Sequence, residues 1–123
     1  MGQPVVHWEL WSKDPEKTSD FYVNAFGWSV KSIPEMNYWL AETGGQGGIN
    51  GGIVKPQQDG PWAGNMSLYI AVPSLAPALE KVKQAGGKVV VEKQEVPGMG
   101  RYALFEDPDG RVMGIWEQQP KAP

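Results

Sequence analysis

The chain has 123 residues, of which 41% are hydrophobic, and a formal net charge of −3 at pH 7. This length and composition predict one folded domain with a core of ordinary size, and they argue against disorder. Lys and Arg are scattered, without the basic stripe that neutralises phosphates, so nucleic acid is not expected as a partner. The chain has no cysteine, which excludes disulfides, thiol chemistry and cysteine-based metal sites.

The sequence gives no sign of a membrane segment or of a leader. No apolar run approaches the roughly 20 residues that a helix needs to cross a bilayer, so no membrane association is expected. The start, Met1 to Pro4, lacks the charged and apolar regions of a secretory signal. We therefore expect a cytoplasmic protein.

The first predicted element is a strand over residues 5–11. Its even positions are all apolar (Val6, Trp8 and Leu10), whereas its odd positions include both ionisable side chains, His7 and Glu9. Successive side chains of a strand point to opposite faces of the sheet. The even face is therefore expected to pack on a helix, and the odd face to have another role.

A helix is predicted to follow. Asp14 is a suitable N-cap, Pro15 fits the first helical position and Gly27 ends the segment. The positions that recur at helical spacing are Thr18, Phe21, Tyr22, Ala25 and Phe26. The glycine-rich run 44–52 lacks a following helix and a P-loop lysine, which favours a hairpin turn over a phosphate-binding loop.

The second half of the chain repeats the first at a constant interval. Gly27 recurs as Gly87, and His7 is matched by Ser67. A second strand has the apolar positions Met66, Leu68, Ile70 and Val72, opposite Ser67, Tyr69 and Ala71. A second helix is predicted with Ser74 as its cap, Leu75, Leu79 and Val82 on its apolar face, and Gly86 and Gly87 at its end. The segment 106–110 is expected to form a β-turn, because it lacks the carboxylate spacing of a calcium loop.

The repeat defines the expected architecture. Each copy reads as strand, helix and three further strands, so the chain is an α+β protein of paired βαβββ modules. We expect a single domain over residues 1–123, with module one at about 4–55, a connector at 56–65 and module two at about 66–118. Paired curved mixed sheets of this kind can form a cup that encloses a pocket.

Three segments resemble the vicinal-oxygen-chelate superfamily, which includes glyoxalase I, bleomycin-resistance proteins and extradiol dioxygenases. They are HWELWSKDPEKTSDFYVNAFGW, SLYIAVPSLAPALEKVKQAGGKV and RYALFEDPDGRVMGIWE. The DPxxxxxFY and FGW helix signature and the FxDPDG hairpin lie where the superfamily has them. The resemblance implies two βαβββ modules around a cleft, and commonly a homodimer.

The resemblance also implies four positions for the ligands of a divalent metal, one in the first and one in the last strand of each module. His7 fits the first, but the counterparts are Ser67, Gly114 and either Gly51 or Gly52. Three of the four ligands are thus missing, and transition-metal sites are normally built from three or more such ligands. We expect no metal and no other cofactor, the alternative being a metal enzyme with atypical ligands.

The expected contents of the cup define a candidate binding site. Its predicted ligand-binding residues are Trp11, Trp62, Asn65, Ser67, Tyr69, Gly114 and Trp116. Glycine at the former metal positions is expected to leave room in which a ligand ring stacks on Trp11 or Trp116. The alternative is that these tryptophans fill a core or a dimer interface.

His7 and Glu9 are the candidate catalytic residues. A histidine beside a carboxylate could act as a general base with its orienting group. A structural role in hydrogen bonding is the favoured alternative, because such pairs are common. We expect a protein that binds a small organic molecule, aromatic or otherwise hydrophobic. The alternatives are a metal-independent lyase or isomerase that uses His7 and Glu9, and a regulatory or structural module without ligand binding.

Overall fold

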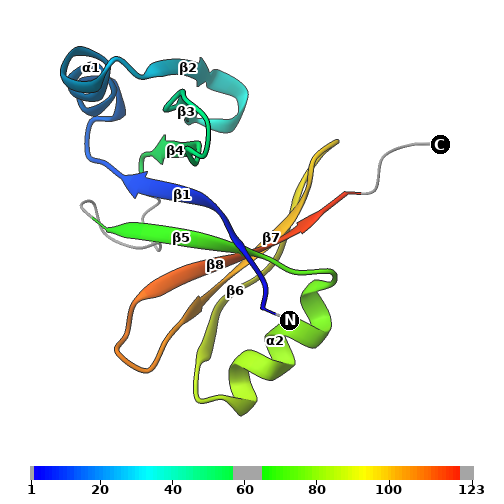
Figure 1. The fold of residues 1–123 in the computed structure, drawn as a ribbon. Coiled ribbons are helices and arrows are strands. Elements are labelled where there is room, and N and C mark those ends of the chain that lie inside the picture. Colours follow the sequence, from blue (N-terminus) through cyan, green and yellow to red (C-terminus); the bar gives the residue numbers. More distant parts are fainter. Residues whose placement is uncertain (1, 57–64, 120–123) are drawn as a thin grey trace. The chain divides into compact units, whose positions relative to one another are not determined.

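The computed structural model describes residues 2–56 and 65–119 (Figure 1). The chain divides into two compact units, an N-terminal unit of Val6–Met66 and a C-terminal unit of Ser67–Pro123 with Met1–Val5. In the described residues no helix is long and apolar enough to span a membrane.

The N-terminal unit is a βαβββ arrangement. Its strands follow the order β2-β3-β4-β1, with β1 and β4 parallel and the other neighbours antiparallel. The elements are β1 (Val5–Trp11), α1 (Pro15–Phe26), β2 (Ser29–Ile33), the 3-10 turn η1 (Pro34–Met36), β3 (Tyr38–Glu42) and β4 (Gly51–Val54).

The C-terminal unit repeats this arrangement. Its strands follow the order β5-β8-β7-β6, and β5 and β8 are the parallel pair. The elements are β5 (Met66–Ala71), α2 (Leu75–Gln84), β6 (Lys88–Val96), β7 (Gly100–Glu106) and β8 (Val112–Gln118). The predicted α+β fold of paired βαβββ units with mixed sheets is therefore confirmed.

Helix α1 begins and ends where the sequence predicts. The Asp14 carboxylate accepts a hydrogen bond from the Lys17 backbone N–H at 3.2 Å, and Gly27 ends the helix in the left-handed region at φ 74°. The predicted apolar face is partly wrong, because Phe21 is 59% and Phe26 65% exposed. Phe21 is two residues from the buried Ser19 and so lies on the opposite side of the helix.

The first backbone N–H of helix α2 is capped by a residue that lies far from the helix in the sequence. Ser74 occupies the N-cap position, but its side chain makes no capping hydrogen bond. The Leu75 backbone N–H instead donates to Glu117 Oε1, on β8, at 2.8 Å. The predicted N-cap position of Ser74 is therefore confirmed, but a carboxylate from the neighbouring strand, and not the Ser74 side chain, satisfies this free backbone donor.

This difference predicts unequal effects of two substitutions. Glu117→Ala should lower the free energy of unfolding by about 1–2 kcal/mol, because it leaves the Leu75 N–H without its acceptor. Ser74→Ala should change it by less than about 0.5 kcal/mol. Urea unfolding measures both. Arg101→Ala controls for the ion pair of Arg101 with Glu117 at 3.5 Å, and equal losses for Ser74→Ala and Glu117→Ala would contradict this assignment.

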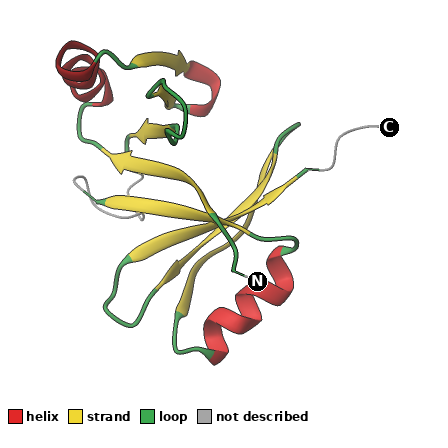
Figure 2. Cartoon of the chain, in the orientation of Figure 1, coloured by secondary structure: helices red, strands yellow, loops and turns green. Residues whose placement is uncertain are grey.

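The core of the C-terminal unit lies between its sheet and α2. Figure 2 shows α2 in red alongside the yellow strands of its sheet. The buried cluster consists of Val72, Leu75, Ala103 and Ile115, packed against Ile70, Ala78, Leu79 and Phe105. The predicted continuous apolar face of β5 is only partly buried, because Met66 is 65% and Leu68 40% exposed. The buried cluster does not extend past Ile70 to the start of that strand.

Both glycine-containing turns have the predicted form. Residues 43–50 join antiparallel β3 to β4, so Gly51 and Gly52 at the end of the glycine-rich run already lie in β4. The Thr43 N–H donates to the Asn50 side chain at 3.0 Å. In the other turn, the Gly110 N–H donates to the Asp107 carbonyl at 2.9 Å. The backbone N–H of Arg111 donates to the Asp107 carboxylate and holds the pKa of Asp107 below its ordinary value. This carboxylate therefore stabilises a β-turn.

Candidate functional site

The strand register defines which residues share the helix-free face of the N-terminal sheet. His7, Glu9 and Trp11 alternate along β1, so they lie on one face. Glu9 pairs with Gly52, and Gly52 with Leu40 of β3. In the same way Trp11 pairs with Val54, and Val54 with Tyr38. The helix-free face of this unit therefore includes His7, Glu9, Trp11, Gly52, Val54, Tyr38, Leu40 and Glu42, with Ser29, Lys31 and Ile33 from β2.

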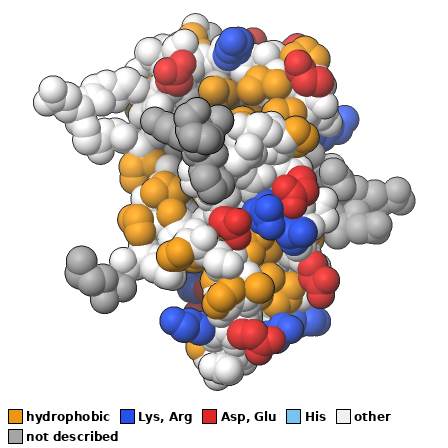
Figure 3. Space-filling model, turned by 90° about the vertical axis from the view of Figure 1, so that its right-hand side faces the viewer, with side chains coloured by type: hydrophobic (Ala, Val, Ile, Leu, Met, Phe, Trp, Pro, Cys, Tyr) orange, Lys and Arg blue, Asp and Glu red, His pale blue; other side chains and the backbone are white. Residues whose placement is uncertain are grey.

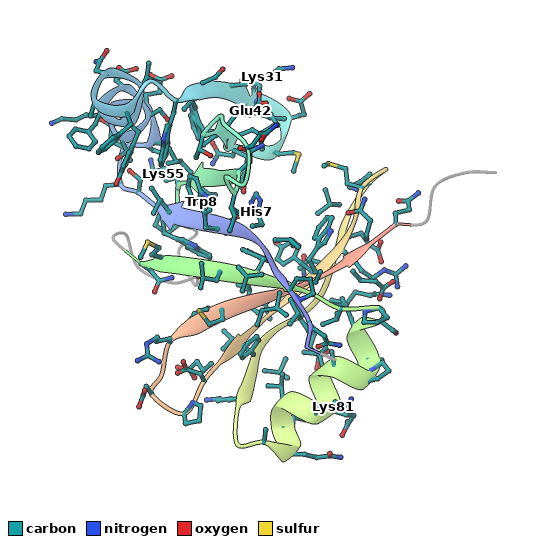
Figure 4. The ribbon with its side chains drawn as sticks, viewed as in Figure 1. His7, Trp8, Lys31, Glu42, Lys55 and Lys81 are labelled. Carbon is teal, nitrogen blue, oxygen red and sulfur yellow. The ribbon has the colours of Figure 1, made fainter. Side chains whose placement is uncertain are left out.

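Trp8 lies on the opposite face of β1. Its ring is 5.2 Å from that of Trp28, which stacks on Tyr22 of α1 at 4.6 Å. The even face of this strand is therefore the helix face, as predicted. Figure 4 shows the side chains of His7 and Trp8 on β1, with Lys31 and Glu42 on β2 and β3.

His7 bonds to a residue that the sequence did not single out. Its Nε2 lies 2.7 Å from Tyr38 Oη, and the two rings are stacked at 20° with centroids 6.4 Å apart. Burial lowers the pKa of His7 from its ordinary value, which favours the neutral ring. No pattern in the sequence marks Tyr38 as a partner of His7. The alternation that marks β1 is not enough to pair it with His7.

Tyr38 also covers a glycine. A Cβ atom at Gly52 would overlap the hydroxyl end of the Tyr38 side chain. Gly51, the other candidate for a former metal position, lies on the helix face, where its Cβ would meet the Trp8 ring. The register therefore identifies Gly52 as the residue on the same face as His7.

The C-terminal unit repeats this arrangement with a different tyrosine. Tyr69 pairs with Gly114, as Glu9 pairs with Gly52. A Cβ atom at Gly114 would overlap the Tyr69 ring. This ring packs edge-to-face on Tyr102, with the centroids 6.3 Å apart. Ser67 is fully buried, and its hydroxyl donates to the Val112 carbonyl at 2.6 Å.

The expected room above these glycines is therefore absent within each unit. A tyrosine ring lies over Gly52 and another lies over Gly114. The prediction that glycine leaves space for a ligand ring is wrong, because the missing side chain makes room for an aromatic residue of the same sheet. A ligand on these faces would meet Tyr38 and Tyr69 before it met either glycine.

The other predicted site residues have the following places. Trp11 is 9% exposed, and its Nε1 has no hydrogen-bond partner within the described part of the chain. The Trp116 Nε1 donates to Gln118 at 2.9 Å. The Asn65 carbonyl accepts a hydrogen bond from the Trp11 backbone at 2.9 Å. Trp62 lies outside the described residues.

A charged hollow lies elsewhere on the C-terminal unit. It is lined by Glu95, Gly100, Arg101, Glu117 and Gln119. Arg101 lies 3.6 Å from Glu95 and 3.5 Å from Glu117, and these side chains are partly exposed. In Figure 3 acidic and basic side chains lie next to one another on the face shown. Such mutually paired surface charges contribute little stability.

The residues at the four metal positions do not fit a metal ion. His7 Nε2 is bonded to Tyr38, the Ser67 hydroxyl is bonded to a backbone carbonyl, and the two glycines carry no donor atom. Across residues 2–56 and 65–119, no group of three or more His, Cys, Asp or Glu residues could hold a metal. Zinc and other first-row metals need several N, O or S ligands at one centre.

The fold and these faces define a class of protein, a duplicated βαβββ protein with polar and aromatic side chains on the helix-free face of each sheet. Residues 5–113 match the family model described as the Glyoxalase/Bleomycin resistance protein/Dioxygenase superfamily. The chain belongs to this superfamily, which confirms the resemblance seen in its sequence.

The curated relatives are longer than this chain. The anthracycline biosynthesis protein DnrV of Streptomyces peucetius is 27% identical over 124 residues, which cover 89% of this chain and 45% of that protein. The putative glyoxylase CFP32 of Mycobacterium bovis is 27% identical over 116 residues, or 92% of this chain and 43% of that protein. The chain thus spans less than half the length of these relatives.

Solved structures of the fold are also similar. Methylmalonyl-CoA epimerase from Mycobacterium tuberculosis superposes with a TM-score of 0.65 at 15% identity, over 94% of this chain and 88% of that chain. At this identity the likeness establishes the fold alone.

Proposed function

We propose that this protein binds a small organic molecule, aromatic or otherwise hydrophobic, without the metal centre of its superfamily. The observation that carries the proposal is that Gly52 and Gly114, which stand at two of the metal positions implied by the family resemblance, lie beneath tyrosine rings. The proposed contacts on the N-terminal unit are His7, Trp11 and Tyr38. Aromatic walls with a few polar groups are typical of small-molecule sites.

Two properties of these contacts favour an aromatic ligand. Trp11, which is 9% exposed, and the half-buried Tyr38 are both aromatic, and rings stack on aromatic surfaces at low entropic cost. Burial lowers the pKa of His7, which favours its uncharged form and suits a neutral ligand. The name of the relative DnrV refers to anthracycline biosynthesis, which makes an anthracycline a suitable first test compound. Tyr69, Ser67, Trp116, Gly114, Asn65 and Trp62 stay predicted ligand contacts.

The second candidate function is a metal-independent lyase or isomerase that uses His7 and Glu9. The bond from His7 to Tyr38 favours it, because a neutral histidine held by a hydroxyl group is a possible general base. Superposition on an epimerase supports only the fold. Turnover that depends on the ionisation of His7 would distinguish this enzyme from a binding protein.

Calorimetric titration tests the proposal. We expect saturable binding of an anthracycline or of another compound from a panel of polycyclic aromatic ligands, with no metal added. His7→Gln should raise the dissociation constant at least about tenfold, which corresponds to a loss of about 1.4 kcal/mol in binding free energy. Tyr22→Phe, on the helix face, is the control and should leave it unchanged. If no compound binds, or if His7→Gln binds as tightly as the native protein, the proposal is wrong.

Three further properties belong to the proposal. A homodimer agrees with the family resemblance and with relatives more than twice as long as this chain. The exposed Phe21 and Phe26 on α1 are available to a second copy. A cytoplasmic location and a single domain over residues 1–123 stay predictions.

A further inference from the structure

Trp11 ends β1 on the helix-free face and carries a hydrogen-bond donor without an acceptor. Its ring is 9% exposed, and its Nε1 is buried with no partner among the groups that the structure describes. An indole N–H donates and cannot accept, so only an acceptor atom can satisfy it. Buried donors in folded proteins nearly always have a partner, and an exception calls for an explanation.

Two other tryptophans have their N–H groups satisfied within the protein. Trp8, on the same strand but on the helix face, donates to the Ile49 carbonyl at 2.7 Å. In the C-terminal unit, Trp116 donates to Gln118 Oε1 at 2.9 Å. The unpaired donor is thus not a general property of the tryptophans of this chain. It occurs on the face that carries the proposed binding residues.

The nearest cross-strand neighbours of Trp11 on this face do not supply an acceptor. Val54 of β4 lies directly beside it in the register and has no polar side-chain atom. Tyr38 is the next residue across the sheet, and its hydroxyl group lies over Gly52 and bonds to His7 at 2.7 Å. Neither neighbour accepts from the indole, so the packing of this sheet buries the donor without pairing it.

We propose that the indole N–H of Trp11 recognises the ligand, and that it binds a neutral carbonyl oxygen carried by an aromatic ring system. This inference rests on the proposed function and specifies the class of ligand. One N–H compensates for the burial of a carbonyl oxygen, whereas an ionised carboxylate costs far more to bury than one hydrogen bond returns. An ammonium group carries donors only and cannot bind to this N–H.

The ligand reaches the N–H through a change of side-chain conformation on this face, because the Trp11 ring is almost covered in this structure. Such side-chain changes are common when proteins bind their partners. The bound state then gains a hydrogen bond at a donor that previously had none. Pairing an unsatisfied buried donor removes its desolvation cost, which is why the carbonyl group is expected to contribute to affinity.

A pair of aromatic probes of similar size tests the proposal. Methyl naphthyl ketone carries a carbonyl group, and ethylnaphthalene has a methylene group in its place. In the native protein the ketone should bind more tightly. The ratio of the two dissociation constants should fall at least about tenfold in Trp11→Phe, which corresponds to about 1.4 kcal/mol. Because the smaller ring affects the packing of both probes alike, the ratio isolates the contribution of the N–H.

Trp8→Phe is the matched control, because it also removes an indole N–H from β1 but on the helix face. This variant should leave the ratio unchanged, and near-ultraviolet circular dichroism would show that each variant is folded. A ratio that is the same in native protein and in Trp11→Phe would overturn the proposal. Tighter binding of naphthoate than of the ketone would overturn the assignment of a neutral ligand.

NMR of the native protein, with nitrogen-labelled tryptophan, gives a readout that does not depend on the folding of a variant. Each of the six tryptophans gives one indole N–H signal. The ketone should move the Trp11 signal downfield, as bonding to an oxygen does, and should leave the Trp8 signal in place. A Trp11 signal that does not move when the ketone binds would overturn the proposal.

The experiment separates this inference from the proposed function. If neither probe bound the native protein, the proposed function would fail and this inference with it. If both probes bound, and their ratio did not depend on Trp11, the protein would still be a binding protein and only this inference would fail.

Discussion

Gly114→Ala is expected to lower the free energy of unfolding by about 1–3 kcal/mol, the usual cost of forcing an extra group into a packed site. On a strand, alanine would otherwise be more stable than glycine by about 0.5–1 kcal/mol. Here alanine is expected to lower the free energy of unfolding instead, because the new Cβ atom would overlap the Tyr69 ring. This ring is 6% exposed and packs on Tyr102, so it cannot move aside without loss.

A double-mutant cycle with Tyr69→Ala isolates this overlap. Tyr69→Ala alone should cost roughly 3–5 kcal/mol, as other buried aromatic truncations do. In that background Gly114→Ala should no longer destabilise, and the interaction energy should equal the cost that the ring imposed. Urea unfolding gives all four free energies. Gly2→Ala, where the new atom meets nothing within 4 Å, is the control and should change stability by less than about 0.5 kcal/mol.

The outcome decides how the glycines of this chain are interpreted. If Gly114→Ala destabilises equally with and without the Tyr69 ring, the ring does not occupy the space above this glycine. If it stabilises the native protein, that space is open, as the sequence suggested. Only a loss of stability on Gly114→Ala that disappears when the Tyr69 ring is removed supports the structure.

The local features of the fold could be predicted because short-range chemistry determines them. Asp14, Pro15 and Gly27 mark the limits of α1 through groups a few residues apart. The alternation along β1 placed His7 and Glu9 on one face before any strand pairing was known. The repeat then gave the order of the elements in both units.

Interactions between distant residues were not predictable in the same way. Tyr38 and His7 are 31 positions apart, and Leu75 and Glu117 are 42 apart. Each contact depends on the register of strands that the sequence does not give. Glycine is a further source of error in predicting a pocket. The space left by the missing side chain can be empty, or it can be filled by the ring of a neighbouring residue. Both Gly52 and Gly114 are of the second kind.

The second large effect expected is the difference in metal content between this chain and a metal enzyme of its superfamily. The four implied positions hold His7, Gly52, Ser67 and Gly114, and the two donors among them are already hydrogen-bonded within their own units. The hydrogen bond between His7 and Tyr38 would have to break before even one strong metal ligand became available. One histidine does not make a transition-metal site of useful affinity.

Metal content is therefore the measurement that tests the central claim most directly. Protein purified without a chelator would be examined by elemental analysis, and then titrated with Zn²⁺, Ni²⁺ and Mn²⁺ in a calorimeter, with His7→Gln as the matched variant. The account predicts well below one metal per chain and no saturable binding that depends on His7. One equivalent of a transition metal that is lost in His7→Gln would contradict it.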